Sequence, residues 1–285
     1  MPELPEVEAL SRSLNRDLTG RTVERVLLRS VAVLKTYDPP LSALDSRSVR
    51  GVGRRGKFID IDLDGVHLVV HLARSGWIRL VTGAGDVRPS LRGPLAARLA
   101  LAGGGAVDVS EQGTEKRLAL YVVRSTEDVV GVARLGIDAL DPALTEEHLA
   151  ELLGASSGTI KGALSDQSVV SGIGNAYSDE ILHAAHISPF RPAARLDHTE
   201  VARLHNAIGA VLTEAIARAI ELEPDRLRDG KRSSMKVHGR TGQACPVCGD
   251  KVREVSLATR SFQYCPTCQT GGRVYADRRL SRLLR

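Results

Sequence analysis

Four cysteines near the end of the chain place the strongest constraint on its fold. They occur as two pairs, Cys245-Pro-Val-Cys248 and Cys265-Pro-Thr-Cys268, and the 16 residues 249–264 separate the pairs. Two C-x2-C pairs at this separation are typical of a tetrahedral zinc site, in which each sulfur lies about 2.3 Å from the metal. Because protein ligands fill all four positions, the sequence predicts one structural Zn2+.

Two other uses of these cysteines compete with zinc. Disulfides are rare in a reducing compartment, and a dithiol redox site needs only one of the two pairs. Zinc binding accounts for both pairs at once. It predicts a β-hairpin in the C-terminal segment 237–285, with Arg260 projecting from a tip near residues 259–261.

The distribution of charge favours a polyanionic partner. The chain has 285 residues and a formal net charge of +5, and its basic residues concentrate in 226–240 and in 273–285. Basic clusters without an amphipathic anchor are more typical of nucleic-acid binding than of membrane binding, although a solvated surface is an alternative. With no apolar run of membrane-spanning length and no secretory signal, we expect a cytoplasmic protein that is not secreted.

Hydrophobic patterning indicates a β-rich first part. Leu4, Val7, Leu10, Leu14 and Leu18 lie on one face of a helix predicted over 3–18. Short runs rich in Val, Ile and Leu then alternate with turns that contain Gly, Asp or Pro, as in a β-sandwich or barrel. These runs predict strands over 22–28, 58–63, 67–72, 78–82, 97–101 and 118–123.

The pattern becomes helical after a breaker at Asp141-Pro142. Helices are predicted over 146–153, 159–164, 176–185 and 199–222, and Pro224 ends the last of them. The expected fold is therefore α+β with several domains. These are a leading helix plus β-sandwich over 1–130, a linker over 131–148, a helical domain over 149–236 and a four-cysteine zinc finger over 237–285.

The first residues combine a proline with several carboxylates. Pro2 and Glu3 follow Met1, and Glu6 and Glu8 come soon after. An ordinary helix start has proline and acidic residues in these places. Pro2 also permits removal of Met1, which would expose a secondary amine that can attack a carbonyl carbon and form an iminium, while Glu3 moves protons. These residues alone leave both interpretations open.

Two further motifs are candidates for phosphate or proton chemistry. Ser171-Gly-Ile-Gly-Asn-Ala-Tyr177 opens a predicted helix, and its backbone N–H groups, together with the side chain of Asn175, can bind a phosphate. A plain helix cap is the alternative. In Arg54-Arg-Gly-Lys57, the cationic neighbours favour proton release from Lys57, and a solvated turn is the alternative.

Taken together and in this order, the motifs closely resemble the formamidopyrimidine-DNA glycosylase / endonuclease VIII family over essentially the whole chain. The matching segments are PELPEVE at 2–8, RRGK at 54–57, HLARSG at 71–76, SGIGNAYSDEIL at 171–182, VHGRTGQ at 237–243 and the cysteine finger. The resemblance implies a monomeric bifunctional DNA glycosylase/AP lyase of base-excision repair. Such an enzyme removes an oxidised base from damaged double-stranded DNA and nicks the strand by β,δ-elimination.

The resemblance also implies catalytic roles for residues of the first part of the chain. Pro2 would attack C1′ of a flipped nucleotide and form a Schiff base. Glu3 would be the general acid and base, and Glu6 would hold the N-terminal helix and its hydrogen bonds. Lys57 would contact phosphate and assist proton transfer during elimination.

DNA contacts implied by the resemblance come mainly from the second part of the chain. Asn175 and Lys161 would hold phosphates beside the lesion through a helix–two-turn–helix element. Arg260 would hold the phosphates that flank the flipped nucleotide and would assist δ-elimination. Cys245, Cys248, Cys265 and Cys268 would bind the zinc ion.

Three departures from the family pattern bear on the choice of substrate. Arg74 stands where the family usually has a methionine that fills the gap left by the flipped base, and an arginine plane can also stack on bases. Glu115-Lys-Arg-Leu-Ala119 replaces DPRRFG, so Arg117 and Leu118 are candidates for the inserted arginine and wedge. The segment 224–237 is short for a loop that caps 8-oxoguanine. The choice among oxidised purines, oxidised pyrimidines and abasic sites stays open.

Two functions without catalysis share some of these motifs. A zinc-ribbon protein that binds abasic or distorted DNA would account for the finger and the charge, and so would a ribosome- or RNA-associated zinc protein. Neither function needs Pro2, Glu3 and Lys57, because binding alone does not require a free N-terminal proline. The sequence therefore favours the enzyme.

Overall fold

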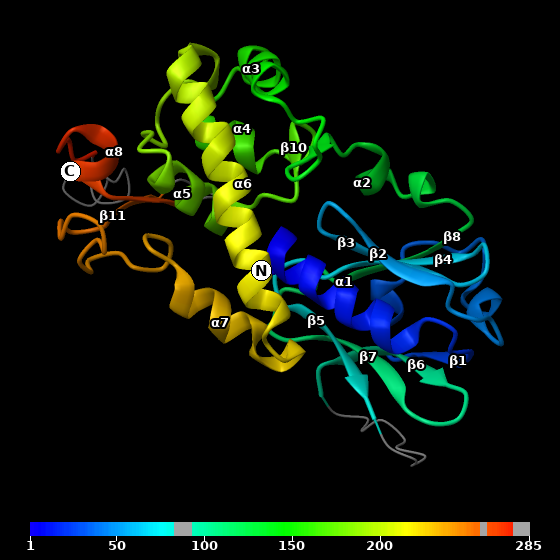
Figure 1. The fold of residues 1–285 in the computed structure, drawn as a ribbon. Helices are drawn as coiled ribbons and strands as arrows, with labels where there is room; N and C mark the ends of the chain where they lie inside the picture. The colour runs from blue at the N-terminus through cyan, green and yellow to red at the C-terminus, as the bar shows by residue number, and fades with distance from the viewer. Residues whose placement is uncertain (83–92, 257–260, 276–285) are drawn as a thin grey trace, which may run out of the picture. The chain divides into compact units, whose positions relative to one another are not determined.

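The computed structural model describes residues 1–82, 93–256 and 261–275, and these fall into two compact units (Figure 1). The first unit contains Met1–Arg134 and Ala219–Leu227, and the second contains Leu135–Arg218 and Arg228–Arg285. Helices and antiparallel sheets occur together, which confirms the expected α+β class. The bounds of the four segments proposed from the sequence stay predictions.

In the first unit, one helix and two four-stranded sheets share a hydrophobic core. Helix α1 covers Leu4–Leu18 and buries its apolar face in that core. The sheets have the strand orders β1-β6-β7-β5 and β2-β3-β4-β8, and every pairing is antiparallel (Figure 1). The strands are β1 Val23–Leu28, β2 Gly51–Arg55, β3 Phe58–Asp62, β4 His67–His71, β5 Gly76–Val81, β6 Leu95–Leu101, β7 Ala106–Glu111 and β8 Ala119–Val123.

Short helical segments complete the first unit. Ala219 and Leu227, which come much later in the chain, join the same hydrophobic core. The segments are η1 Val31–Val33, η2 Leu41–Leu44, η3 Thr126–Asp128, α2 Val130–Ala133 and η5 Pro224–Arg226.

Two strands of this unit were not predicted from the sequence. β2 is an edge strand of sequence GVGRR, and its glycines and arginines have low strand propensity. β7 lies inside its sheet and carries Asp108 in a buried position. Arg98 on β6 satisfies this charge with two hydrogen bonds, Nε to Oδ1 at 2.6 Å and Nη2 to Oδ2 at 2.7 Å. A bidentate pair of this kind allows an acidic residue inside a sheet.

The second unit contains the expected helices and the hairpin of the zinc finger. β11 and β12 are antiparallel, and β9 pairs with β10 in parallel. None of the helices in the described ranges is long and apolar enough to cross a membrane. The elements are β9 Ile137–Asp138, α3 Glu146–Gly154, α4 Ile160–Ser165, β10 Val170–Ser171, α5 Asn175–Ala184, η4 Ala193–Arg195, α6 His198–Ile220, α7 Leu227–Ser234, β11 Arg253–Ser256, β12 Ser261–Tyr264 and α8 Pro266–Thr270. The last two residues of α6 and the first residue of α7 belong to the first unit.

The starts of α3 and α4 follow directly from local chemistry. Thr145 accepts a hydrogen bond from the backbone N–H of His148, and Thr159 accepts one from Gly162, both at 3.2 Å. Threonine at the N-cap satisfies a backbone donor that the helix itself leaves unpaired. By contrast, helix α7, in the basic segment that follows Pro224, was not among the helices predicted from the sequence.

The loop between β4 and β5 depends on Gly76. The Gly76 N–H donates to the carbonyl oxygen of Leu72 at 2.8 Å, and a Cβ atom at Gly76 would lie 2.3 Å from that same oxygen. A backbone atom this close admits no larger residue unless the turn moves. Because Arg74 lies within the turn, Gly76 also fixes the backbone that carries a candidate site residue.

We expect Gly76→Ala to lower the free energy of unfolding of the first unit by about 1–3 kcal/mol, the usual cost of overpacking. Gly53→Ala in β2 is the matched control, because a Cβ there meets nothing within 4 Å. Urea denaturation of both variants measures the difference. Equal stability of the two variants would contradict the steric role of Gly76.

Candidate active site and zinc centre

Two carboxylates fix the backbone at the start of α1. The Glu3 N–H donates to Oε2 of Glu6 at 2.8 Å, and the Glu3 side chain accepts from the Glu6 N–H. This reciprocal pair is a capping box with glutamates in both places. Pro2 directly precedes it and is buried, as are Glu3, at 2% exposure, and Glu6. The candidate nucleophile and the candidate acid therefore occupy a fixed, largely desolvated position.

The hairpin that carries Lys57 is tied to the same helix. Arg54 Nε donates to Oε2 of Glu8 at 2.9 Å, which joins the end of β2 to α1. Burial opposes ionisation of Glu8, but hydrogen bonds from Arg54 and Arg12 together hold its pKa below the ordinary value. Gly56 and Lys57 form the two-residue turn of the hairpin, and the φ of +54° at Gly56 favours glycine. Lys57 is 8% exposed.

His71 is a neighbour of Lys57 that sequence reasoning did not single out. Pairing of β3 with β4 places His71 opposite Phe58, and the two ring centroids are 4.6 Å apart. Burial, reinforced by the positive charge of Lys57, lowers the pKa of His71 to about 4. The imidazole is therefore neutral at pH 7. His71 is well separated from Lys57 and Phe58 in the sequence, so only the pairing of β3 with β4 reveals that it lies near them.

Arg74 and Arg117 converge on a single carboxylate at the surface. Glu115 Oε2 lies 3.2 Å from Nη1 of Arg74 and 3.6 Å from Nη2 of Arg117. A backbone hydrogen bond of 3.2 Å from Gln112 to Ser75 joins the two loops. Exposed ion pairs of this kind contribute little to stability. The structure thus brings together two of the arginines expected to contact DNA and keeps both at the surface.

Leu118 does not occupy the position expected for a DNA wedge. It is 1% exposed and belongs to the core of the first unit. Buried Glu111, another residue that the sequence did not reveal, accepts backbone hydrogen bonds from Arg117 at 2.6 Å and Leu118 at 2.8 Å. Withdrawing a leucine from a core costs roughly 1.5–3 kcal/mol. Leu118, a candidate for the wedge, would therefore have to leave this core to insert into DNA.

In the second unit, Gln167 shapes the turn that precedes α5. Its Nε2 donates to the carbonyl oxygen of Ile173 at 2.7 Å, and its Oε1 accepts from the N–H of Gly172 at 3.0 Å. Asn175 then begins the helix, and its Oδ1 is buried without a hydrogen-bond partner among the described residues. An amide in this position can bind an anion through its N–H2 group, together with the first N–H groups of the helix.

Lys161 occupies a different environment from the one expected. Its side chain is fully buried, and its ammonium group donates to Oδ1 of Asp179 and to the carbonyl oxygen of Ser261. The ammonium also lies 5.0 Å from the ring centre of Phe262. In this structure Lys161 holds α4, α5 and β12 together, which differs from the phosphate contact expected from the sequence.

Two carboxylates of α5 hold the segment that leads into the zinc finger. Glu180 accepts backbone hydrogen bonds from Lys236, Val237 and His238 at 2.8–2.9 Å. Burial raises the pKa of Glu180, and these three donors oppose the rise. Asp179 Oδ2 lies 2.9 Å from Nδ1 of His238. The finger segment is therefore fastened to α5 by polar contacts.

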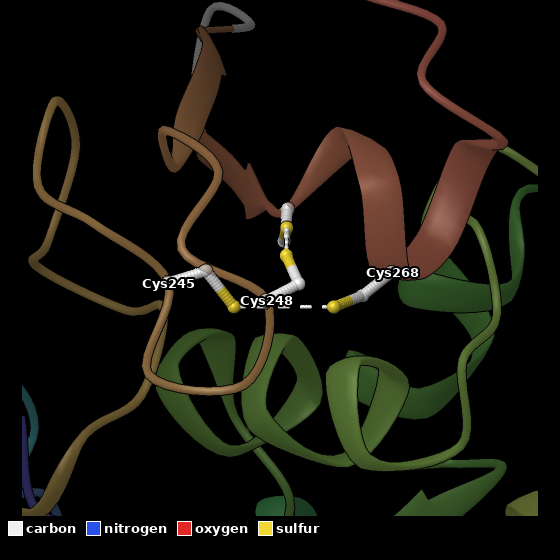
Figure 2. Close-up of side chains that lie close together, drawn as sticks. Cys245, Cys248 and Cys268 are labelled. Carbon is white, nitrogen blue, oxygen red and sulfur yellow. Dashed lines mark hydrogen bonds between the residues drawn. The ribbon is translucent and has the colours of Figure 1, made fainter.

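The four cysteine sulfurs lie within 4.8 Å of one another, and Figure 2 shows those of Cys245, Cys248 and Cys268 pointing toward a common centre. The separations are 3.9 Å between Cys245 and Cys268 and 3.3 Å between Cys248 and Cys265. Tetrahedral zinc with bonds of about 2.3 Å requires sulfurs roughly 3.8 Å apart. The cluster therefore fits one structural Zn2+.

Burial disfavours the thiolate form of two of these cysteines, and a nearby cation would offset that effect. Burial raises the pKa of Cys265 to about 11, and it also raises the pKa of Cys268. Four neighbouring thiolates would be unfavourable in this environment by themselves. A bound Zn2+ supplies the compensating charge and keeps the ligands deprotonated.

Aromatic side chains support the finger hairpin. Aromatic residues make up only 3% of the chain, yet Phe190, Phe262, Tyr264 and Tyr275 form one cluster, with ring centroids 4.3–6.2 Å apart. β11 and β12 confirm the predicted hairpin strands. Arg260 lies outside the described residues, so its role stays a prediction.

Comparisons with known proteins agree with this architecture. Family models match residues 1–117 as the formamidopyrimidine-DNA glycosylase N-terminal domain, 135–223 as the formamidopyrimidine-DNA glycosylase H2TH domain, and 242–271 as the zinc finger found in FPG and IleRS. The formamidopyrimidine-DNA glycosylase of Moorella thermoacetica is 38% identical over 90% of this chain and 94% of the relative. The chain belongs to the formamidopyrimidine-DNA glycosylase family.

Solved structures of this glycosylase family have the same fold. The MutM (Fpg) protein of Thermus thermophilus is 33% identical, with a TM-score of 0.81 over 94% of this chain and 98% of that one. The Lactococcus lactis formamidopyrimidine-DNA glycosylase, solved bound to DNA containing an AP site, is 25% identical. Its TM-score is also 0.81, over 94% of this chain and 99% of that one.

We expect His71 to make the first unit less stable in acid. Its folded-state pKa of about 4 lies below the ordinary value of 6.5, so the unfolded chain binds the proton first and stability is lost as the pH falls through this window. His71→Phe keeps a ring beside Phe58 but cannot titrate. The loss of unfolding free energy between pH 7 and pH 4 should shrink by on the order of 1–3 kcal/mol in this variant, as measured by urea denaturation. An identical pH dependence of stability in the wild type and in His71→Phe would refute the lowered pKa of His71.

Proposed function

We propose that this protein is a DNA glycosylase of base-excision repair that also cleaves the strand at the resulting abasic site. The observation that carries the proposal is the capping box of Glu3 and Glu6, which holds buried Pro2 at the start of α1. The tie between Glu8 and Arg54 brings the hairpin of Lys57 to the same helix. Family membership supports the same activity.

Pro2 becomes a nucleophile when Met1 is removed. Met1 is half exposed, so a processing enzyme can reach it. The lone pair of the proline nitrogen then forms a bond to C1′ of the damaged nucleotide. The glycosidic bond breaks, and the base leaves with the bonding electrons and a proton. A secondary amine is suited to this step because its adduct can become an iminium.

Glu3 moves the protons that this chemistry requires. Its carboxyl group is buried beside Pro2, where proton transfer to the ring oxygen of the sugar opens the ring and leaves the iminium between Pro2 and C1′. The iminium acidifies the hydrogens on C2′. Removal of one of them expels the 3′ phosphate, and a second elimination expels the 5′ phosphate. Lys57 would hold a phosphate and assist these proton transfers.

The phosphate contacts proposed for the second unit come from Asn175 and Arg260. Asn175 has an amide end without a partner at the N-terminus of α5, and an amide can present either oxygen or N–H2 there. On the first unit, Arg74 and Arg117 lie at the surface and can exchange Glu115 for bases or phosphates of DNA. Such contacts would offset the few kcal/mol needed to flip a nucleotide out of the stack. We propose that the enzyme acts as a monomer with one structural zinc.

Borohydride trapping on a duplex with one abasic site tests the proposal. Reduction of the iminium should link the protein covalently to DNA, and unreduced reactions should give β,δ-elimination products. In a variant that keeps an N-terminal extension, the amine of Pro2 is blocked. This variant should form no adduct, but it should still shift the duplex in an electrophoretic mobility assay. Absence of an adduct from correctly processed wild-type protein would overturn the lyase assignment.

The same assay separates catalysis from mere binding. A protein that only recognises abasic DNA would shift the duplex equally with and without the extension and would never be trapped. Lys57→Ala should slow strand cleavage but still permit trapping, because the nucleophile is intact.

A set of duplexes with 8-oxoguanine, formamidopyrimidine, thymine glycol and dihydrouracil then identifies the bases that the enzyme removes.

A further inference from the structure

One side chain of α5 contacts a cysteine of the zinc cluster directly. Nε2 of His183 lies 3.4 Å from Sγ of Cys245, a separation at which an N–H group can donate to sulfur. Both residues are 2% exposed. The imidazole therefore meets the sulfur in an environment without solvent, where a hydrogen bond is stronger than in water.

A second contact supports the same arrangement from the end of the helix. Nδ1 of His186 lies 3.2 Å from the carbonyl oxygen of Cys268. The side chain of Gln269 in α8 also donates to the carbonyl oxygen of Ile187 at 2.9 Å. Both cysteine pairs thus have a member in contact with the C-terminal end of α5 or with the residues that follow it.

We propose that His183 is a positioning residue of the zinc centre, whose Nε2–H donates a hydrogen bond to the Cys245 thiolate and fixes that ligand against α5. Four thiolates around Zn2+ carry a net charge of −2, which is costly to bury. An N–H donor withdraws part of this charge from one sulfur and orients it. A neutral imidazole that faces a thiolate through Nε2 holds its proton on that nitrogen.

The position of His183 gives the hydrogen bond a second consequence. His183 follows Asp179 by four residues and Glu180 by three, so the three side chains share one face of α5. The two carboxylates hold His238, the backbone of 236–238 and β12, and His183 adds the metal ligand. The zinc site and the finger segment are therefore aligned on one helix, whose first residue is Asn175.

Replacement of His183 in the full-length zinc protein tests this role. His183→Phe keeps a ring of similar size without a donor, and His183→Gln keeps an N–H donor. Chelator competition should show an increase of about 10–100-fold in the zinc dissociation constant of His183→Phe. His183→Gln should recover most of the loss. His205→Phe removes a partly buried imidazole that bonds Leu144 elsewhere in the unit, and it should leave zinc affinity unchanged.

Cobalt substitution and NMR provide readouts that packing alone would not move. Loss of the donor makes the sulfur more electron-rich, so the sulfur-to-cobalt charge-transfer band of His183→Phe should shift to lower energy. In the cadmium-113 form of the wild type, the Nε2–H of His183 should show scalar coupling to the metal. Because this coupling is measured on the wild type, it tests the hydrogen bond from His183 to Cys245 even if His183→Phe does not fold.

Three results would overturn the assignment of His183. One is a His183→Phe variant whose zinc affinity and cobalt spectrum are the same as those of the wild type. The second is an equal loss of affinity in the Phe and Gln variants without cadmium coupling, which would reduce His183 to a packing residue. The third is the absence of a proton on Nε2 in the zinc-loaded wild type.

Discussion

Asp179 and Glu180, adjacent on α5, are the buried charges around which the second unit is organised. Their carboxylates accept hydrogen bonds from Lys161 in α4, from the backbone of 236–238 and from the backbone of β12. A buried carboxylate without partners costs several kcal/mol, so these segments must meet at α5 for the unit to fold. The cysteine cluster lies at the end of the same helix, in contact with His183. Binding of zinc and folding of the finger are therefore coupled to α5.

The first unit uses the same principle at smaller scale. The carboxylates of Glu3 and Glu6 cap α1 reciprocally, and Glu8 binds Arg54 at the end of β2. These contacts fix the start of α1 and join the end of β2 to it, and both segments carry residues that a reacting nucleotide would have to approach. Buried acids thus hold the elements together, and we propose that one of them, Glu3, also moves protons.

The sequence predicted those elements whose apolar side chains repeat along one face, such as α1 and α6. It did not predict β2, because the glycines and arginines of this strand have no such pattern and pair with β3 only in the folded protein. Candidate site residues could be named because they stand in short motifs. Burial could not be predicted, since it depends on tertiary packing. Lys161 and Leu118 therefore lie in the interior, although the family resemblance implied a phosphate contact for Lys161 and made Leu118 a candidate wedge. The contact between His183 and Cys245 has no local signal in the sequence.

The most direct measurement is the location of the covalent bond in the borohydride-trapped complex. Proteolysis of the adduct followed by tandem mass spectrometry should place the sugar remnant on the nitrogen of Pro2, in an N-terminal peptide that lacks Met1. A remnant on Lys57 or on any other lysine would contradict the central claim. It would mean that the buried start of α1 supports the site without supplying its nucleophile.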